Sequence, residues 1–140
     1  MNTKERLKQY LPLSREVVQL EQRLDAINSK LYYPQSPKWD GMPRGSGTSD
    51  PTGRVIQQKE AALELYERKR DALTAMLREI EDAMQVLTPT ERMLVRYRYM
   101  DGLAWEEICL VMGYSWTHIH RIHSAALVKL AAAEERKAQG

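Results

Sequence analysis

The chain has 140 residues, of which 43% are hydrophobic and 29% are charged, and its formal net charge is +2 at pH 7. No apolar stretch approaches the roughly 18 residues that a membrane-spanning helix needs, and 7 Gly with 6 Pro are too few for a collagen-like or low-complexity protein. The lone Cys109 cannot form an intrachain disulfide, and the charged N-terminus lacks the apolar core of a signal peptide, so we expect a soluble cytoplasmic protein.

The first segment, residues 1–33, repeats apolar side chains with the period of a coiled coil. The spacings alternate between three and four residues, which places one narrow apolar stripe along a helix. The stripe consists of Tyr10, Leu13, Val17, Leu20, Leu24, Ile27 and Leu31. Pro12 is expected in the first helical turn or at a break there.

Residues 34–53 hold prolines and glycines at a density that breaks helices and strands, so they predict a long loop. Trp39 in this loop could pin it to the neighbouring helices or anchor a protein partner, and the sequence does not decide between the two. Arg44 could reach into a DNA minor groove, although a solvated loop charge is the simpler interpretation.

The third segment, about residues 54–87, repeats the period of the first. Its stripe consists of Leu63, Tyr66, Arg70, Leu73, Leu77, Ile80, Met84 and Leu87, in which Arg70 is the one polar member. A helix of this length is about 51 Å long and cannot bury its own stripe. We therefore predict an antiparallel coiled-coil hairpin over residues 1–87, interrupted by the loop at 34–53. A dimerisation surface is the alternative, and the two can coexist.

Residues 88–140 predict three further helices. Thr88 can cap the first of them, Pro89 suits its first position, and Glu91 completes a capping box. This helix runs through ERMLVRYRYM and ends at Asp101-Gly102, and the short helix WEEICLVM ends at Gly113. Ser115 then caps a third helix, WTHIHRIHSAALVKL.

The spacing around Gly113 is typical of a helix-turn-helix. Such a motif needs a residue that tolerates positive φ in the turn and a small residue where the helices cross, and Cys109 lies four residues before the glycine. Ile108 and Met112 would face inward from the first helix, Ile119 and Ile122 from the second, while Tyr114 fills the corner. An ordinary helical hairpin is the alternative.

The outward face of the last helix is then the candidate DNA-reading surface. Arg121 can donate two hydrogen bonds to guanine O6 and N7, and Trp116 or Thr117 can touch a thymine methyl. Free backbone N–H groups near Ser115 suit a phosphate, and Arg92, Arg96 and Arg98 on the earlier helix could reach others. The predicted DNA-binding residues are Ser115, Trp116, Thr117, His118, His120, Arg121, Ser124, Arg92 and Arg96.

The same residues resemble region four of bacterial sigma factors, the part that reads the promoter −35 element. The resemblance rests on Leu87-Thr88-Pro89 with Glu91-Arg92, then Arg98-Tyr99, Gly102-Leu103, Glu106-Glu107-Ile108, Gly113, Ser115 and the closing Ala126-Leu127 with Leu130. It implies a helix-turn-helix that binds double-stranded DNA, with RNA polymerase as a second potential partner. It also implies a structural pair between Arg98 and Glu107.

The chain as a whole resembles small phage and prophage proteins that join such a C-terminus to a coiled coil, the ArpU- and RinA-like transcription regulators. Their loop resembles Gly41-Met42-Pro43-Arg44-Gly45-Ser46-Gly47 in this sequence. The resemblance implies a regulator that works in the cytoplasm of a bacterial host. No part of the chain resembles sigma region two, which melts promoters.

Residues that could perform chemistry are few. His120 and His123 have a helical metal-ligand spacing, but no Cys or carboxylate on that helix completes a set, so no metal and no cofactor is expected. Cys109 has no basic neighbour in sequence and is expected to be a core residue rather than a nucleophile. Protonation of the three histidines, His120 above all, would add charge against DNA as the pH falls.

We therefore predict an all-α protein that is not an enzyme: a coiled-coil hairpin over residues 1–87, then a DNA-binding domain over residues 88–140. The predicted function is sequence-specific transcription regulation, with a homodimer through the coiled coil as an option. A phage terminase small subunit that recognises DNA for packaging is one rival, and a protein that only docks on RNA polymerase is another.

Overall fold

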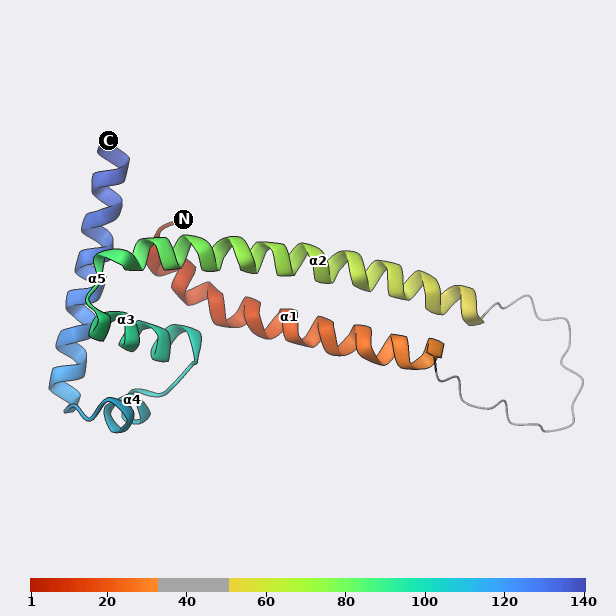
Figure 1. Cartoon of the computed structure of the whole chain (residues 1–140), viewed down its shortest axis with the longest axis horizontal. Coiled ribbons are helices and arrows are strands. Elements are labelled where there is room, and N and C mark those ends of the chain that lie inside the picture. The colour runs from red at the N-terminus through yellow and green to blue at the C-terminus, as the bar shows by residue number, and fades with distance from the viewer. Residues whose placement is uncertain (33–50) are drawn as a thin grey trace, which may run out of the picture. The chain divides into compact units, whose positions relative to one another are not determined.

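A computed structural model of the chain describes residues 1–32 and 51–140 (Figure 1). Every element in these residues is helical, in the order α1 (Thr3–Tyr32), α2 (Pro51–Ala83), η1 (Met84–Val86), α3 (Pro89–Val95), η2 (Arg96–Met100), α4 (Trp105–Met112) and α5 (Trp116–Gln139). This confirms the all-α class, with a helical hairpin followed by a C-terminal helical domain. The predictions for Trp39, Arg44 and the Gly41–Gly47 run lie outside the described residues.

The described chain divides into two compact units. Unit 1 contains Met1–Arg15 and Asp71–Gly140, and unit 2 contains Glu16–Arg70. The start of α1 and the end of α2 therefore share a unit with the helix-turn-helix residues. No helix within the described ranges is long and apolar enough to cross a membrane. The proposed domain boundary after residue 87 stays a prediction.

Helix α1 is longer than its apolar stripe requires. Its start is fixed by reciprocal hydrogen bonds, because Glu5 N donates to Asn2 Oδ1 at 2.8 Å and Asn2 N donates to Glu5 Oε2 at 3.2 Å. Pro12, which was expected in a first turn or at a break, instead lies inside the continuous helix. Proline has no N–H and so removes one helical hydrogen bond, which the packing of the flanking turns must offset.

In unit 2 the apolar stripe of α1 is buried. Val17, Leu20, Leu24 and Ile27 are only 7–8% exposed. The stripe of α2 lies elsewhere than predicted, because Leu63 is 38% exposed and Arg70 is also exposed, whereas Ala62 and Lys69 are half-buried. Lys69 Nζ pairs with Glu16 Oε1 at 3.4 Å, so α2 turns the face that carries Ala62 and Lys69 toward α1.

In unit 1 the core has two clusters. The first joins Leu7 of α1 and Ile80 of α2 to Met84, Leu87, Val95, Ala126 and Leu130, with Tyr99 and Met100 packed against it. The second consists of Leu94, Ile108 and Ile119. Of the predicted stripe residues of α2 here, Ile80 is buried, while Leu73 and Leu77 are half-buried.

The helix predicted over ERMLVRYRYM is not uniform. Its α-helical part ends at Val95, and residues 96–100 form a π-helical turn, in which Asp101 N donates to Arg96 O at 2.9 Å. Tyr97 packs against the second core cluster, whereas Tyr99 and Met100 pack against the first. The wider turn therefore lets one short segment contribute side chains to both clusters.

Candidate nucleic-acid interface

The turn between α4 and α5 has the backbone that the sequence predicts. Gly113 adopts φ 72° and ψ 29°, a left-handed conformation that favours glycine, and its N–H donates to Cys109 O at 2.9 Å. A Cβ at this position would meet no atom within 4 Å, so the requirement for glycine comes from the backbone and not from space. Ile108 and Ile119 face each other in the second core cluster and are fully buried.

Helix α5 begins where the sequence indicates. Ser115 Oγ accepts a hydrogen bond from His118 N at 3.2 Å, which satisfies one of the free N–H groups of the first turn. Only the buried face of α5, at Ile119, Ala126 and Leu130, enters the core. The rest of the helix surface along its first turns is largely exposed to solvent.

One part of this surface is an exposed ridge, which we define as Thr117, Arg121, Ser124 and Val128. These residues follow spacings of four, three and four, so they lie on one line along the helix. Val128 is 68% exposed and belongs to the ridge, although sequence reasoning did not include it. The same helical period that identified Arg121 and Ser124 could have found it.

A hollow lies on each side of the ridge, and Arg121 borders both. The larger, about 630 Å³, lies between the start of α3 and α5 and includes Thr88, Tyr114, Ser115, His118 and Lys129 among its lining residues. The smaller, about 500 Å³, is lined by Trp116, Thr117, His120, Arg121 and Ser124. The structure therefore brings together all seven of the predicted DNA-binding residues on α5 and its cap.

The larger hollow is lined by an ion pair in which only the carboxylate is buried. Lys129 Nζ lies 2.7 Å from Glu91 Oε1, and Glu91 is only 5% exposed. Burial raises the pKa of Glu91, but the hydrogen bonds from Lys129 and Thr88 outweigh it, so the net pKa lies below the ordinary value. Lys129 thus has a partner within the protein. The predicted capping box of Thr88 and Glu91 is formed.

His120 is half-buried between two indole rings. Its ring centroid lies 4.7 Å from that of Trp105 and 4.5 Å from that of Trp116. The Nε2 atom is buried and meets no hydrogen-bond partner among the described residues. His120 is therefore only partly exposed, at the smaller hollow, and its Nε2 atom is not available to a ligand.

The other two histidines have tyrosine neighbours. His118 is exposed and stacks on Tyr114, with ring centroids 4.5 Å apart. A 2.8 Å hydrogen bond joins His123 Nε2 to Tyr99 Oη. Burial lowers the pKa of His123, and His120, Arg98 and Lys4 lower it further by charge repulsion. His123 is therefore a half-buried residue of unit 1, and its lowered pKa favours the neutral imidazole.

The arginines of the preceding helical segment are held by protein acceptors. Arg92 Nη1 donates to Leu87 O at 2.9 Å, and Arg96 Nη2 pairs with Glu81 Oε2 at 2.7 Å. Arg98 does not form the pair with Glu107 that the resemblance implied. It donates to Leu103 O at 3.1 Å and lies over the Trp105 ring at 4.6 Å, because the π-helical turn directs it toward α4. Arg121 on the ridge is exposed, and no hydrogen bond or ion pair holds it within the described part of the chain.

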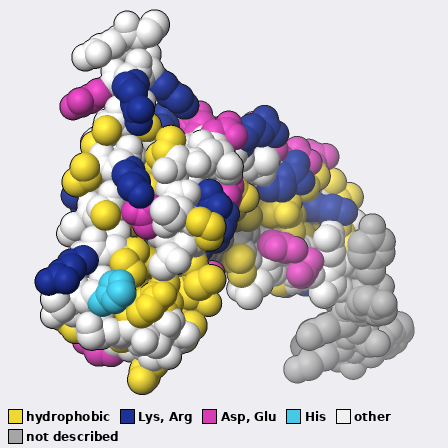
Figure 2. Space-filling model, turned by 60° about the vertical axis from the view of Figure 1, so that its left-hand side comes forward, with side chains coloured by type: hydrophobic (Ala, Val, Ile, Leu, Met, Phe, Trp, Pro, Cys, Tyr) yellow, Lys and Arg dark blue, Asp and Glu magenta, His cyan; other side chains and the backbone are white. Residues whose placement is uncertain are grey.

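Charge on the surface is mixed. On the face that Figure 2 displays, basic side chains alternate with acidic and hydrophobic ones, and one histidine lies close to a basic side chain. The first turn of α4 carries the exposed carboxylates of Glu106 and Glu107, which would repel a phosphate there. Contact with a polyanion would therefore concentrate at the start of α5.

The described residues hold no group of three His, Cys, Asp or Glu side chains that could bind a metal ion. Residues 83–132 match the Sigma-70, region 4 family. This segment is thus a sigma-region-four-like helix-turn-helix. Neither the comparison with curated proteins nor that with solved structures found a match.

Proposed function

We propose that this protein binds double-stranded DNA in a sequence-specific way, with the first turns of α5 in the major groove. The observation that carries the proposal is Arg121: an exposed guanidinium, without a partner in the described part of the chain, on a ridge that follows the Ser115 cap. Arginine reads guanine through O6 and N7, and helix N-termini favour phosphates. The sigma-region-four match of the surrounding segment supports the same function.

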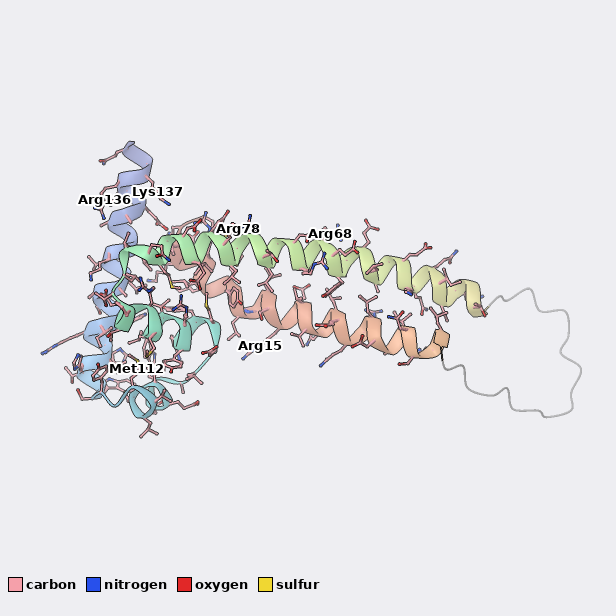
Figure 3. The ribbon with its side chains drawn as sticks, in the orientation of Figure 1. Arg15, Arg68, Arg78, Met112, Arg136 and Lys137 are labelled. Carbon is pink, nitrogen blue, oxygen red and sulfur yellow. The ribbon has the colours of Figure 1, made fainter. Side chains whose placement is uncertain are left out.

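Selection of duplexes from a random library by the full chain tests this proposal. We expect an enriched site that contains guanine, and Arg121→Ala should weaken binding to it. Arg136→Ala is a matched control, because Arg136 is an exposed arginine on the same helix, near the C-terminal end of α5 (Figure 3). At a rise of 1.5 Å per residue, 15 residues separate the two by about 22 Å. Failure to enrich any sequence would overturn the proposal.

Within this function we propose the role of a transcription regulator of the ArpU- and RinA-like phage and prophage type, acting in the cytoplasm of a bacterial host without catalysis or a cofactor. Support comes from the whole-chain resemblance, in which a coiled coil precedes the DNA-binding segment. Transcription of a reporter from a promoter that carries the selected site, with and without the protein, tests this role. An unchanged transcript level would contradict it.

A homodimer through the hairpin is the assembly that we propose. Unit 2 exposes apolar side chains along its helices, namely Val18 at 48%, Ile56 at 44% and Leu63 at 38%. A second copy would bury them and present two reading helices to two half-sites. The mass of the protein in solution tests the assembly: two chains are expected, and a large ring would instead favour a terminase small subunit.

RNA polymerase is a second candidate partner. Leu110 is 83% exposed and Val111 58% exposed on α4, which gives the helix-turn-helix an apolar surface of its own. A footprint on the selected duplex without polymerase would reject a protein that only docks on the polymerase. Binding to polymerase with no such footprint would favour it.

A further inference from the structure

Trp116 is a large apolar side chain at the DNA-facing start of α5, yet it is 51% exposed. Its ring contacts that of His120 in a tilted arrangement, with centroids 4.5 Å apart and planes at 55°. His120 in turn contacts Trp105 at 4.7 Å, and Trp105 packs against the second core cluster. Trp105, His120 and Trp116 thus form a row of ring contacts, which we call the stack, and Trp116 is its outer end.

Further contacts hold the inner end of this stack. The Arg98 guanidinium lies 4.6 Å from the Trp105 ring centroid, and His123 meets the same ring edge-on at 4.8 Å. Such contacts add to the burial of the indole and fix its orientation. His120 is thus held on both of its sides by rings. With its Nε2 atom covered, this imidazole does not offer that nitrogen to a base, and it lies between the Trp105 and Trp116 rings.

The outer indole shares the smaller hollow with Arg121. Arginine in this position suits guanine, while the exposed ring face of the indole offers apolar surface to the neighbouring base edge. The C5-methyl group of thymine is the apolar group that a base presents in the major groove, and cytosine lacks it. A preoriented ring also loses little side-chain freedom on binding, which favours its use as a contact.

We propose that Trp116 is a specificity-determining residue that contacts the C5-methyl group of a thymine beside the guanine read by Arg121. His120 is its positioning residue, since it fixes the indole without touching DNA. This inference rests on the proposed function and goes beyond it, because it assigns a second base and a residue that acts only through another. It also predicts that substitutions of Arg121, Trp116 and His120 change base preference in different ways.

The test uses the duplex that the full chain selects from a random library. Each thymine is replaced in turn by uracil, which removes only the methyl group. Affinity of the wild-type protein should fall about three- to fivefold at one position, as expected for burial of a single methyl group. Trp116→Ala should bind the thymine and uracil duplexes equally, while it keeps the guanine preference that depends on Arg121.

His120 variants separate positioning from general damage to the fold. His120→Ala should reduce the discrimination between thymine and uracil, whereas His120→Phe, which preserves a flat ring in the stack, should restore it. The preference for guanine should be unchanged in both variants. Circular dichroism melting confirms that each variant is folded.

Three results would overturn the inference. One is a wild-type protein that is indifferent to every thymine methyl, a result that requires no variant to fold. Another is a methyl effect that persists in Trp116→Ala, which would assign the contact to Thr117 or Val128. The third is a His120→Ala variant with full discrimination. Failure to select any duplex would instead reject the proposed function itself, and this inference with it.

Discussion

Arg121 and Arg96 are both arginines of unit 1, but they meet different surroundings. Arg96 pairs with Glu81 at 2.7 Å, whereas Arg121 is exposed beside two hollows. The sequence predicted DNA contacts for both, because it does not show which arginine has a carboxylate partner in the folded protein. Only the fold shows that Arg96 donates a hydrogen bond to the carboxylate of Glu81, 15 residues earlier in the chain.

Arg121→Ala should therefore cost roughly 1–3 kcal/mol of binding free energy on the selected site and relax the preference at one base. Arg96→Ala should change the free energy of unfolding by about 1 kcal/mol or less, because the pair with Glu81 is partly exposed. Titrations at fixed salt, with melting curves for both variants, measure these effects. Equal DNA affinity of Arg121→Ala and wild type would show that the reading helix has been wrongly assigned.

His123 leads to a prediction about pH. Its folded pKa lies below the ordinary value of about 6.5, first because of burial, so the unfolded chain binds the proton more readily. Its contribution to stability is complete above pH ~6.5 and is lost as the pH falls through the folded pKa. The groups that face it are Tyr99, Trp105, His120, Arg98 and Lys4.

The melting temperature of the wild type should thus fall as the pH is lowered from about 7.5 to about 5.5, and that of His123→Phe should fall less. This range keeps Glu91 ionised, since its own pKa is lowered. Identical pH profiles for the two proteins would remove His123 as the cause. The expectation from the sequence that DNA affinity rises as the pH falls stays a prediction.

At the scale of elements, the sequence predicted where the helices lie, but it did not predict which face of α2 is buried in unit 2. The caps at Thr88 and Ser115 and the turn at Gly113 form as expected, because each depends on residues close together in the chain. The face of α2 in unit 2 depends on what lies opposite. Leu63 fits the predicted heptad, but it is exposed. Lys69, which lies outside the predicted stripe, pairs with Glu16 instead.

This difference gives a matched pair of substitutions. Leu24→Ala removes a side chain that is 8% exposed and should cost roughly 2–5 kcal/mol of unfolding free energy. Leu63→Ala removes one that is 38% exposed and should cost clearly less in the monomeric chain. Chemical denaturation of both variants gives the comparison. An equal or larger loss for Leu63→Ala would favour the heptad predicted from the sequence, or burial of Leu63 by a second copy, which the mass of the variant would resolve.

The whole molecule is less modular than its sequence indicates. Leu7 and Ile80 are fully buried in the same cluster as Val95, Ala126 and Leu130, and Thr3 N donates to the Glu134 carboxylate. The long-range contacts of α1 could not be foreseen, because its apolar stripe was assigned wholly to the hairpin.

A chain of residues 88–140 should accordingly lose the cooperative melting of the full protein and its binding to the selected duplex. Leu7→Ala in the full chain should cost roughly 2–5 kcal/mol of unfolding free energy, although it lies more than 100 residues from the reading helix in sequence. Lys8→Ala, at an exposed neighbouring position, is the control. A stable, fully active 88–140 fragment would show that the contacts of α1 and α2 in the first core cluster are dispensable.

The central claim is that the first turns of α5 read the major groove, and methylation interference tests it most directly. Dimethyl sulfate methylates guanine at N7 in the major groove and adenine at N3 in the minor groove. We predict that methylation of one guanine N7 in the selected duplex blocks the wild-type protein and has no effect on Arg121→Ala. Interference confined to adenine N3, or a guanine effect that Arg121→Ala retains in full, would contradict the account.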